Sequence, residues 1–140
     1  MIQELFPYVS LAFGLLMVLS TLQFVFVVYR DAIVRDVSGI PPVYWSVGVA
    51  FFPVPFHPLY AYFAVRAGRR GEPLSRRDRW GTWIYGTVIG AALIGVLASP
   101  PDPITQSVIQ VGLLVPFGGI LYLLVFAGGT DVLIRRFGDC

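Results

Sequence analysis

The chain is short of three residue types, and each shortage excludes a class of function. It has no lysine, one histidine, His57, and one cysteine, Cys140. A single cysteine rules out an intrachain disulfide, a CxxC redox pair and a cysteine-based metal site. No acid–base pair, metal constellation or nucleotide-binding loop is recognisable either. The sequence therefore predicts a non-enzymatic protein with no metal and no cofactor.

Charge is scarce as well. Charged residues make up 13% of the chain and hydrophobic residues 56%, whereas a soluble domain carries about a quarter charged residues. Most of the chain must therefore be solvated by lipid. The first apolar segment lacks the positive region of a signal peptide and is longer than its apolar core, so we expect it to be retained as a transmembrane helix.

Four stretches are long enough to cross a bilayer, which takes roughly 20 apolar residues. They cover about 5–29, 43–65, 80–98 and 104–127, and short connections separate them. Short connections make neighbouring helices antiparallel. We expect an all-α integral membrane four-helix bundle that forms one transmembrane domain over residues 1–140.

The arginines set the expected orientation. If all four segments span, the loop over 66–79 lies on the same side as Arg135 and Arg136, whereas Arg30 and Arg35 lie on the other side. Cytoplasmic loops carry an excess of positive residues. This distribution predicts a multi-pass protein of the cytoplasmic (inner) cell membrane with both termini inside, N-in and C-in.

The second segment contains three prolines, which leave an alternative open. Pro53, Pro55 and Pro58 each remove a helical hydrogen bond, so we expect this spanning helix to be kinked or broken near them. If the segment instead dips into the membrane and returns, all ten arginines lie on one side. That alternative places irregular backbone at membrane depth, where protein or a water-filled cavity has to cover it.

A family resemblance lies within residues 43–70. It is carried by Trp45, Phe52, Pro53, Leu59, Tyr60, Arg66, Arg69 and Arg70. These residues resemble the second half of the short membrane hairpin at the N-terminus of phospholipase D-type cardiolipin synthases. The chain has Pro-Phe-His-Pro at 55–58 where that family has a proline-glycine step. The resemblance implies membrane anchoring without chemistry, because the HxK motifs of the superfamily are absent.

His57 is the one titratable group near the middle of an uncharged segment. Such a group is costly in a membrane and is by default a functional hypothesis. A proton relay or a metal site would need partners, and no Asp, Glu or Cys lies in the same segment. The simpler interpretation is that the ring hydrogen-bonds a carbonyl freed by Pro55 or Pro58.

Three glutamines extend the candidate polar path. Gln106 and Gln110 lie one helical turn apart, so they share a face of the fourth helix and could line a polar crevice with Gln23 of the first helix. Interhelical hydrogen bonding is the simpler account of the same residues.

Small residues recur at helical spacing in the third segment, notably Gly86, Gly90 and Gly95. Small residues let a second helix approach closely in a membrane. This face either packs inside the same bundle or forms a homodimer contact.

The basic loop is the strongest charge feature, with Arg66, Arg69, Arg70, Arg76, Arg77 and Arg79. Its simplest role is to fix orientation, and it could also contact anionic lipid headgroups or a protein partner. Nucleic acid is not expected, because the loop is short, carries Glu72 and Asp78, and lies against the bilayer. Aromatic residues near the predicted span ends read as interfacial anchors: Trp45, Trp80, Trp83, Tyr29, Tyr44 and Tyr85.

Two functions remain open from the sequence. The first is an accessory subunit, anchor or scaffold that acts through helix packing and its basic loop, with a membrane-protein partner or as a homo-oligomer. The alternative is an oligomeric small transporter or channel that uses the broken second helix and the polar face of the fourth. An enzyme of lipid metabolism has the least support, because the acidic residues Asp31 and Asp131 each stand four residues before an arginine and read as structural pairs.

Overall fold

The computed structural model describes residues 2–68 and 74–128, with side chains from Glu4 onward. Within these ranges the chain is helical and contains no strand, which confirms the all-α prediction. The elements are α1 (Ile2–Arg35), the short 3-10 helix η1 (Val37–Gly39), α2 (Pro42–Phe51), α3 (Pro53–Arg66), α4 (Arg76–Ala98) and α5 (Pro103–Phe126).

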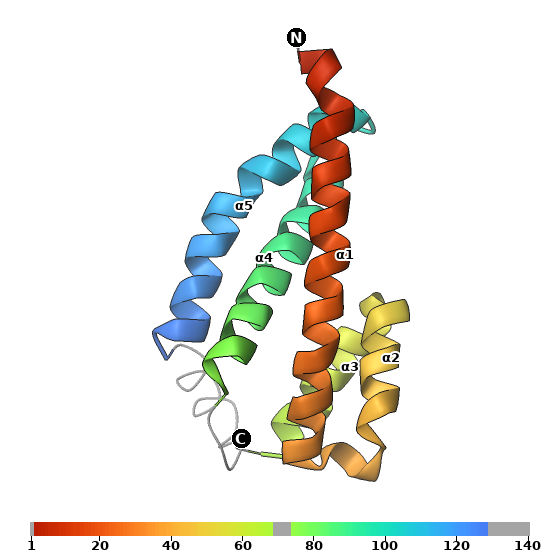
Figure 1. The fold of residues 1–140 in the computed structure, drawn as a ribbon, viewed down its shortest axis with the longest axis vertical. Helices are drawn as coiled ribbons and strands as arrows, with labels where there is room; N and C mark the ends of the chain where they lie inside the picture. The colour runs from red at the N-terminus through yellow and green to blue at the C-terminus, as the bar shows by residue number, and fades with distance from the viewer. Residues whose placement is uncertain (1, 69–73, 129–140) are drawn as a thin grey trace.

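Three helices, α1, α4 and α5, are long and apolar enough to cross a membrane. They contain 34, 23 and 24 residues, which at 1.5 Å per residue gives about 51, 35 and 36 Å. The hydrocarbon core of a bilayer is about 30 Å thick. Successive long helices run in opposite directions, and α4 lies between α1 and α5 (Figure 1).

The predicted second span is replaced by a helical hairpin. Helix α2 has 10 residues and α3 has 14, so they extend about 15 and 21 Å and neither is long enough to cross. The helix stops at Phe51 because residue 52 precedes a proline and leaves the helical conformation. Pro53 then occupies the first position of α3, where its missing N–H costs nothing.

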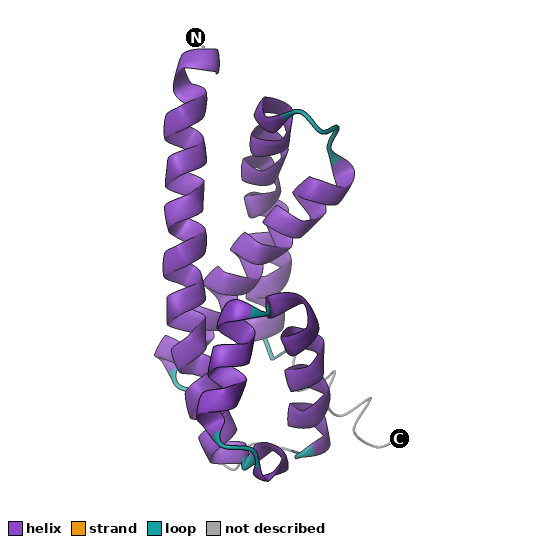
Figure 2. Ribbon diagram, turned by 90° about the vertical axis from the view of Figure 1, so that its right-hand side faces the viewer, coloured by secondary structure: helices purple, strands orange, loops and turns teal. Residues whose placement is uncertain are grey.

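The hairpin returns to the end of the molecule from which it started. The chain reverses after α1 through three residues with positive φ, Asp36, Ser38 and Gly39. Helix α2 then runs back along α1, and α3 returns toward η1. Figure 2 shows the hairpin facing the viewer over the lower half of the molecule. This is the geometry of the second alternative, in which the segment dips in and turns back.

The described ends of the long helices bear on the predicted arrangement. The beginning of α1 and the end of α5 lie at opposite ends of the molecule (Figure 1), and the N-in, C-in orientation stays a prediction. The predicted four-span bundle becomes three long helices and one hairpin. The cause is the break at residue 52, which leaves each half of the segment too short to span.

The best buried core lies where the hairpin packs on α1. It contains Val28, Ala32, Val37, Trp45 and Val49, which are each at most 2% exposed. The Trp45 indole N–H donates to the Val37 carbonyl at 3.4 Å, and its ring contacts those of Tyr60 and Phe63. Trp45 is therefore a core residue of the hairpin, and the prediction that it anchors the membrane interface is wrong.

Candidate functional site

His57 joins the hairpin to α4. Its Nδ1 lies 2.5 Å from the carbonyl oxygen of Pro53, and its Nε2 lies 2.5 Å from the hydroxyl of Tyr85 on α4. A carbonyl only accepts, so Nδ1–H donates to Pro53, and Nε2 and the Tyr85 hydroxyl share the second hydrogen bond. The two contacts use both ring nitrogens.

The sequence interpretation of His57 was right about a carbonyl partner and wrong about which one. The Pro53 carbonyl lies one turn earlier in the same helix and is not freed by Pro55 or Pro58. The second partner, Tyr85, was predicted to be an interfacial anchor but is 4% exposed, with the Phe24 ring stacked on it at 4.2 Å. No local pattern marks Tyr85 as a partner, because the contact depends on the return of the hairpin.

The glutamines of the predicted polar path lie at different levels of α4. Gln23 of α1 lies against Gly81 near the start of α4. The amide of Gln110 donates to the Ala92 carbonyl at 3.4 Å, eleven residues or about 16 Å further along the helix. Gln106 is half-buried on the same helix as Gln110. The structure therefore separates Gln23 from the α5 pair, and interhelical packing accounts for the contacts of Gln23 and Gln110.

The small-residue face of α4 is covered by α5 of the same chain. A Cβ atom added at Gly86 would lie 3.0 Å from Leu121, one at Gly90 2.8 Å from Phe117, and one at Gly95 would overlap the side chain of Gln110. Packing within the bundle thus uses this face, and the homodimer alternative for these glycines is not what the structure shows.

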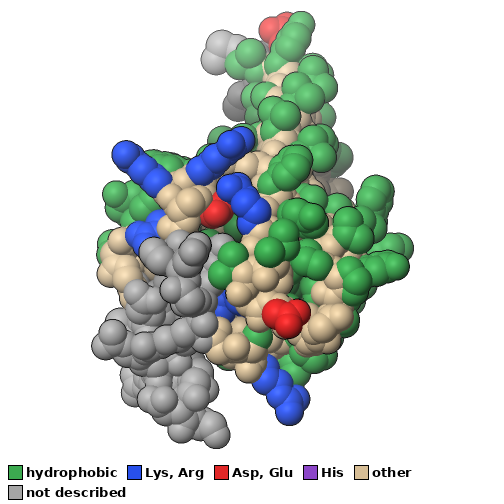
Figure 3. All heavy atoms as spheres, turned by 60° about the horizontal axis from the view of Figure 1, so that its bottom comes forward, with side chains coloured by type: hydrophobic (Ala, Val, Ile, Leu, Met, Phe, Trp, Pro, Cys, Tyr) green, Lys and Arg blue, Asp and Glu red, His purple; other side chains and the backbone are tan. Residues whose placement is uncertain are grey.

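Arginines gather at the end where α1 and α3 finish and α4 begins, which we call the arginine end. In the described parts of the chain it carries Arg30, Arg35, Arg66, Arg76, Arg77 and Arg79. Figure 3 views the molecule with this end turned forward and shows the basic side chains around it. Arg69 and Arg70 lie outside the described residues. Arg30 and Arg35 were predicted on the opposite side, and the returning hairpin brings them to this one.

Two of these arginines are held by carboxylates. The Arg30 guanidinium lies 2.5 Å from an oxygen of Asp78, whose side chain is 4% exposed. Arg35 Nε donates to both oxygens of Asp31 at 3.0 and 2.9 Å, which confirms the predicted i,i+4 pair. The Tyr60 hydroxyl also donates to Asp31, at 2.6 Å.

Arg35 additionally closes the hairpin. Its terminal nitrogen donates to the Gly68 carbonyl at 2.6 Å and to the Ala64 carbonyl at 3.4 Å. Carbonyls at the end of a helix lack intrahelical partners and carry partial negative charge, so a guanidinium is well placed there. The guanidinium therefore fastens the end of α3 to the end of α1.

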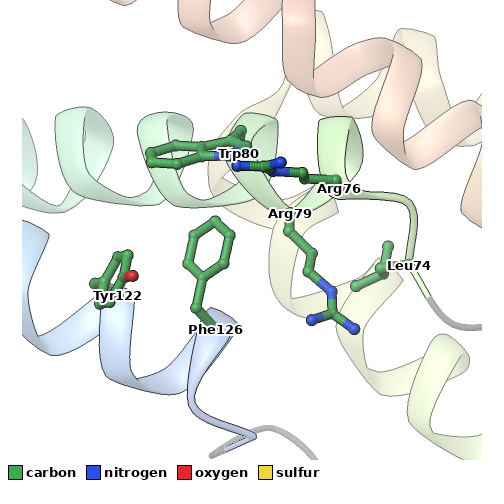
Figure 4. Close-up of a pocket in the computed structure, with 6 residues that line it drawn as sticks. All are labelled: Leu74, Arg76, Arg79, Trp80, Tyr122 and Phe126. Carbon is green, nitrogen blue, oxygen red and sulfur yellow. The ribbon is translucent and has the colours of Figure 1, made fainter.

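A pocket opens at the arginine end between the start of α4 and the end of α5 (Figure 4). Its volume is about 380 Å³. Its lining combines two guanidinium groups with apolar and aromatic side chains: Leu74, Arg76, Arg79, Trp80, Tyr122 and Phe126.

The opposite end of the molecule carries the start of α5. Asp102 caps that helix, accepting hydrogen bonds from the Thr105 hydroxyl at 2.5 Å and from its backbone N–H at 2.8 Å. These hydrogen bonds, first the one from the hydroxyl, hold the pKa of the Asp102 carboxyl below its usual value. Over the described ranges, the structure contains no group of three or more His, Cys, Asp and Glu residues that could hold a metal ion.

Comparison of the chain with protein-family models, with curated proteins and with solved structures finds no match. The resemblance to the cardiolipin synthase hairpin therefore stays a prediction.

Proposed function

We propose that the protein is a non-enzymatic integral membrane anchor or scaffold. It acts through the packing of its helices and through the arginine end, which meets anionic lipid headgroups and a membrane-protein partner or a second copy of the chain. The hairpin of α2 and α3 serves as an additional anchoring element, as the resemblance to the synthase hairpin implies.

The distribution of arginine supports one orientation of this anchor. Every described arginine lies at the arginine end, and Glu4 lies at the other end of α1. The positive-inside rule then places the arginine end in the cytoplasm and the start of α1 across the membrane. The protein is proposed to sit in the cytoplasmic membrane in this orientation.

The observation that carries the proposal is that the charged side chains buried along α1 and α4, and the single histidine, are paired within the chain. Arg30 pairs with Asp78, Arg35 with Asp31, and His57 with Tyr85. These contacts fasten α1 to α4 and the hairpin to α4. By contrast, Arg76 and Arg77 are exposed at the arginine end.

Purification from native membranes in mild detergent, followed by native mass spectrometry, tests the proposal. We expect a membrane-protein partner or a second copy at fixed stoichiometry. Arg66→Gln combined with Arg77→Gln should weaken that complex, because both side chains are exposed at the arginine end and lie outside its pocket. Glu4→Gln at the other end should leave it unchanged. A monomer with no partner in every preparation would contradict the proposal.

A small transporter or channel is the second candidate, and the hairpin is the observation that favours it. Discontinuous helices that meet part-way through a membrane often form a substrate or ion site, and His57 lies one turn from the break between α2 and α3. In this function His57→Ala and Gln110→Leu each abolish flux in reconstituted vesicles while the fold survives. Normal flux in both variants excludes this use of the hairpin.

A further inference from the structure

The pocket between α4 and α5 has a basic side and an aromatic side. Arg76 and Arg79 come from the first turn of α4, and Tyr122 and Phe126 come from the last turns of α5 (Figure 4). The Phe126 ring lies 4.9 Å from both the Trp80 and Tyr122 rings, so the three rings form one continuous apolar wall.

The charge of the basic side is not neutralised by the nearest acid. Asp78 lies between Arg76 and Arg79 in sequence, but its carboxylate is buried against Arg30 of α1. Among the described residues, Arg76 and Arg79 form no hydrogen bond and no ion pair. Two positive charges therefore face the pocket while the adjacent negative charge serves a helix contact.

The aromatic wall faces outward. Trp80 is 37% exposed and Tyr122 is 47% exposed, on helices that are both long and apolar enough to cross the membrane. Exposed tryptophan and tyrosine at a span end are typical of the headgroup region of a bilayer. The pocket thus lies at the depth where lipid phosphates and the first part of the acyl chains are found.

We propose that this pocket binds the headgroup phosphate of one anionic phospholipid from the surrounding bilayer. The phosphate lies between Arg76 and Arg79, and the glycerol and upper acyl chains lie along Trp80 and Phe126. Guanidinium groups suit this ligand because they bind phosphate oxygens through paired hydrogen bonds. A volume of about 380 Å³ is sufficient for a headgroup. The inference deepens the proposed function and rests on its placement of the arginine end.

A membrane lipid is a better match than a soluble phosphate compound. A soluble anion would use the two guanidinium groups and leave the aromatic wall without a partner. An anionic lipid uses both sides, and its local concentration at the arginine end is set by the bilayer.

The test titrates the purified full chain in detergent with phosphatidylglycerol, and separately with phosphatidylcholine, and counts bound lipids by native mass spectrometry. We expect one phosphatidylglycerol to bind in preference to phosphatidylcholine. Glycerol 3-phosphate at millimolar concentration should not displace it. Equal binding of the two lipids, or full displacement by glycerol 3-phosphate, overturns the proposal.

A matched pair of double variants locates the site. Arg76→Gln with Arg79→Gln removes two charges from the pocket, and Arg66→Gln with Arg77→Gln removes two charges from the same end outside it. We expect the first to weaken phosphatidylglycerol binding roughly 25-fold, because each arginine contributes about fivefold, and the second to change it less than threefold. Equal losses in both would mean that only net charge matters and would overturn the assignment.

The outcome is distinguishable from failure of the proposed function. The complex with a partner or second copy is scored by protein stoichiometry, and the pocket is scored by a single lipid adduct. If the pocket variant did not fold, the preference of the wild-type chain for one phosphatidylglycerol, resistant to glycerol 3-phosphate, would still decide the proposal.

Discussion

The guanidinium of Arg30 at the end of α1 lies 2.5 Å from the carboxylate of Asp78 in the first turn of α4. The Asp78 side chain is 4% exposed and that of Arg30 is 43% exposed. The pair therefore joins a buried anion to a cation that still reaches water, and it holds the two helix ends at the same level.

This asymmetry predicts unequal costs for removing each partner. Arg30→Gln leaves a buried carboxylate without its cation and should lower the free energy of unfolding by about 1–3 kcal/mol, toward the low end because Arg30 is partly solvated. Asp78→Asn should cost less, because Arg30 can then turn to water. Unfolding in mixed detergent micelles measures both, and an Asp78→Asn cost equal to or above that of Arg30→Gln contradicts the interpretation.

The hairpin makes a topological prediction. With Cys140→Ser as background, cysteines at Ile40 and Ser75 should react with a membrane-impermeant maleimide from the same side, and a cysteine at Pro101 should react from the other side. Labelling in right-side-out and inverted vesicles measures this. If residues 43–65 formed one full span, the cysteines at Ile40 and Ser75 would be labelled from opposite sides.

Helix packing predicts a contrast between two glycines. A Cβ at Gly95 would overlap Gln110 and lie 3.3 Å from its Cα, whereas a Cβ at Gly112 meets nothing within 4 Å. Gly95→Ala should force α4 and α5 apart and cost about 1–3 kcal/mol. Gly112→Ala should be neutral or slightly stabilising, since alanine favours a helix over glycine by about 1 kcal/mol. Detergent unfolding of both variants provides the comparison, and equal effects would argue against a close α4–α5 contact at Gly95.

The cap of α5 predicts a pH effect in acid. The folded pKa of Asp102 is lowered from its usual 3.8 by hydrogen bonds from Thr105. A carboxyl with a depressed folded pKa stabilises the protein above its unfolded pKa and loses this contribution as the pH falls through the folded value. The difference in melting temperature between wild type and Asp102→Ala should therefore be constant from pH 7 to about pH 5 and shrink below pH 4. A difference that grows in acid would contradict the cap.

Hydropathy was enough to predict the three long helices but not the fold of the second segment. The stretches at 5–29, 80–98 and 104–127 lie within α1, within α4 and largely within α5, because apolar length is a local property. The second stretch is also long and uncharged, yet it turns back at residue 52. Whether such a stretch spans or turns back depends on what covers its tip, which is a tertiary contact.

In the candidate site, too, local contacts were predictable from the sequence and tertiary contacts were not. The pairing of Asp31 with Arg35 was predictable because helical spacing alone brings them together. The contact of Arg30 with Asp78 joins residues that the predicted topology placed on opposite sides of the membrane, so it was missed. His57 and Tyr85 lie on segments that were predicted to be neighbours, and their contact was missed because no local spacing marks the two residues as partners. The pocket was missed because α5 supplies two of its six lining residues from more than 40 residues away.

The hairpin reaches only part of the way along α1 and therefore thickens one half of the molecule (Figure 2). In a bilayer, α2 and α3 would add their cross-sectional area to that of the three long helices in the leaflet at the arginine end. The other leaflet would contain the three long helices alone. The protein then has the shape of a wedge. Many copies side by side would expand one leaflet relative to the other. This would favour membrane curvature with the arginine end on the convex face.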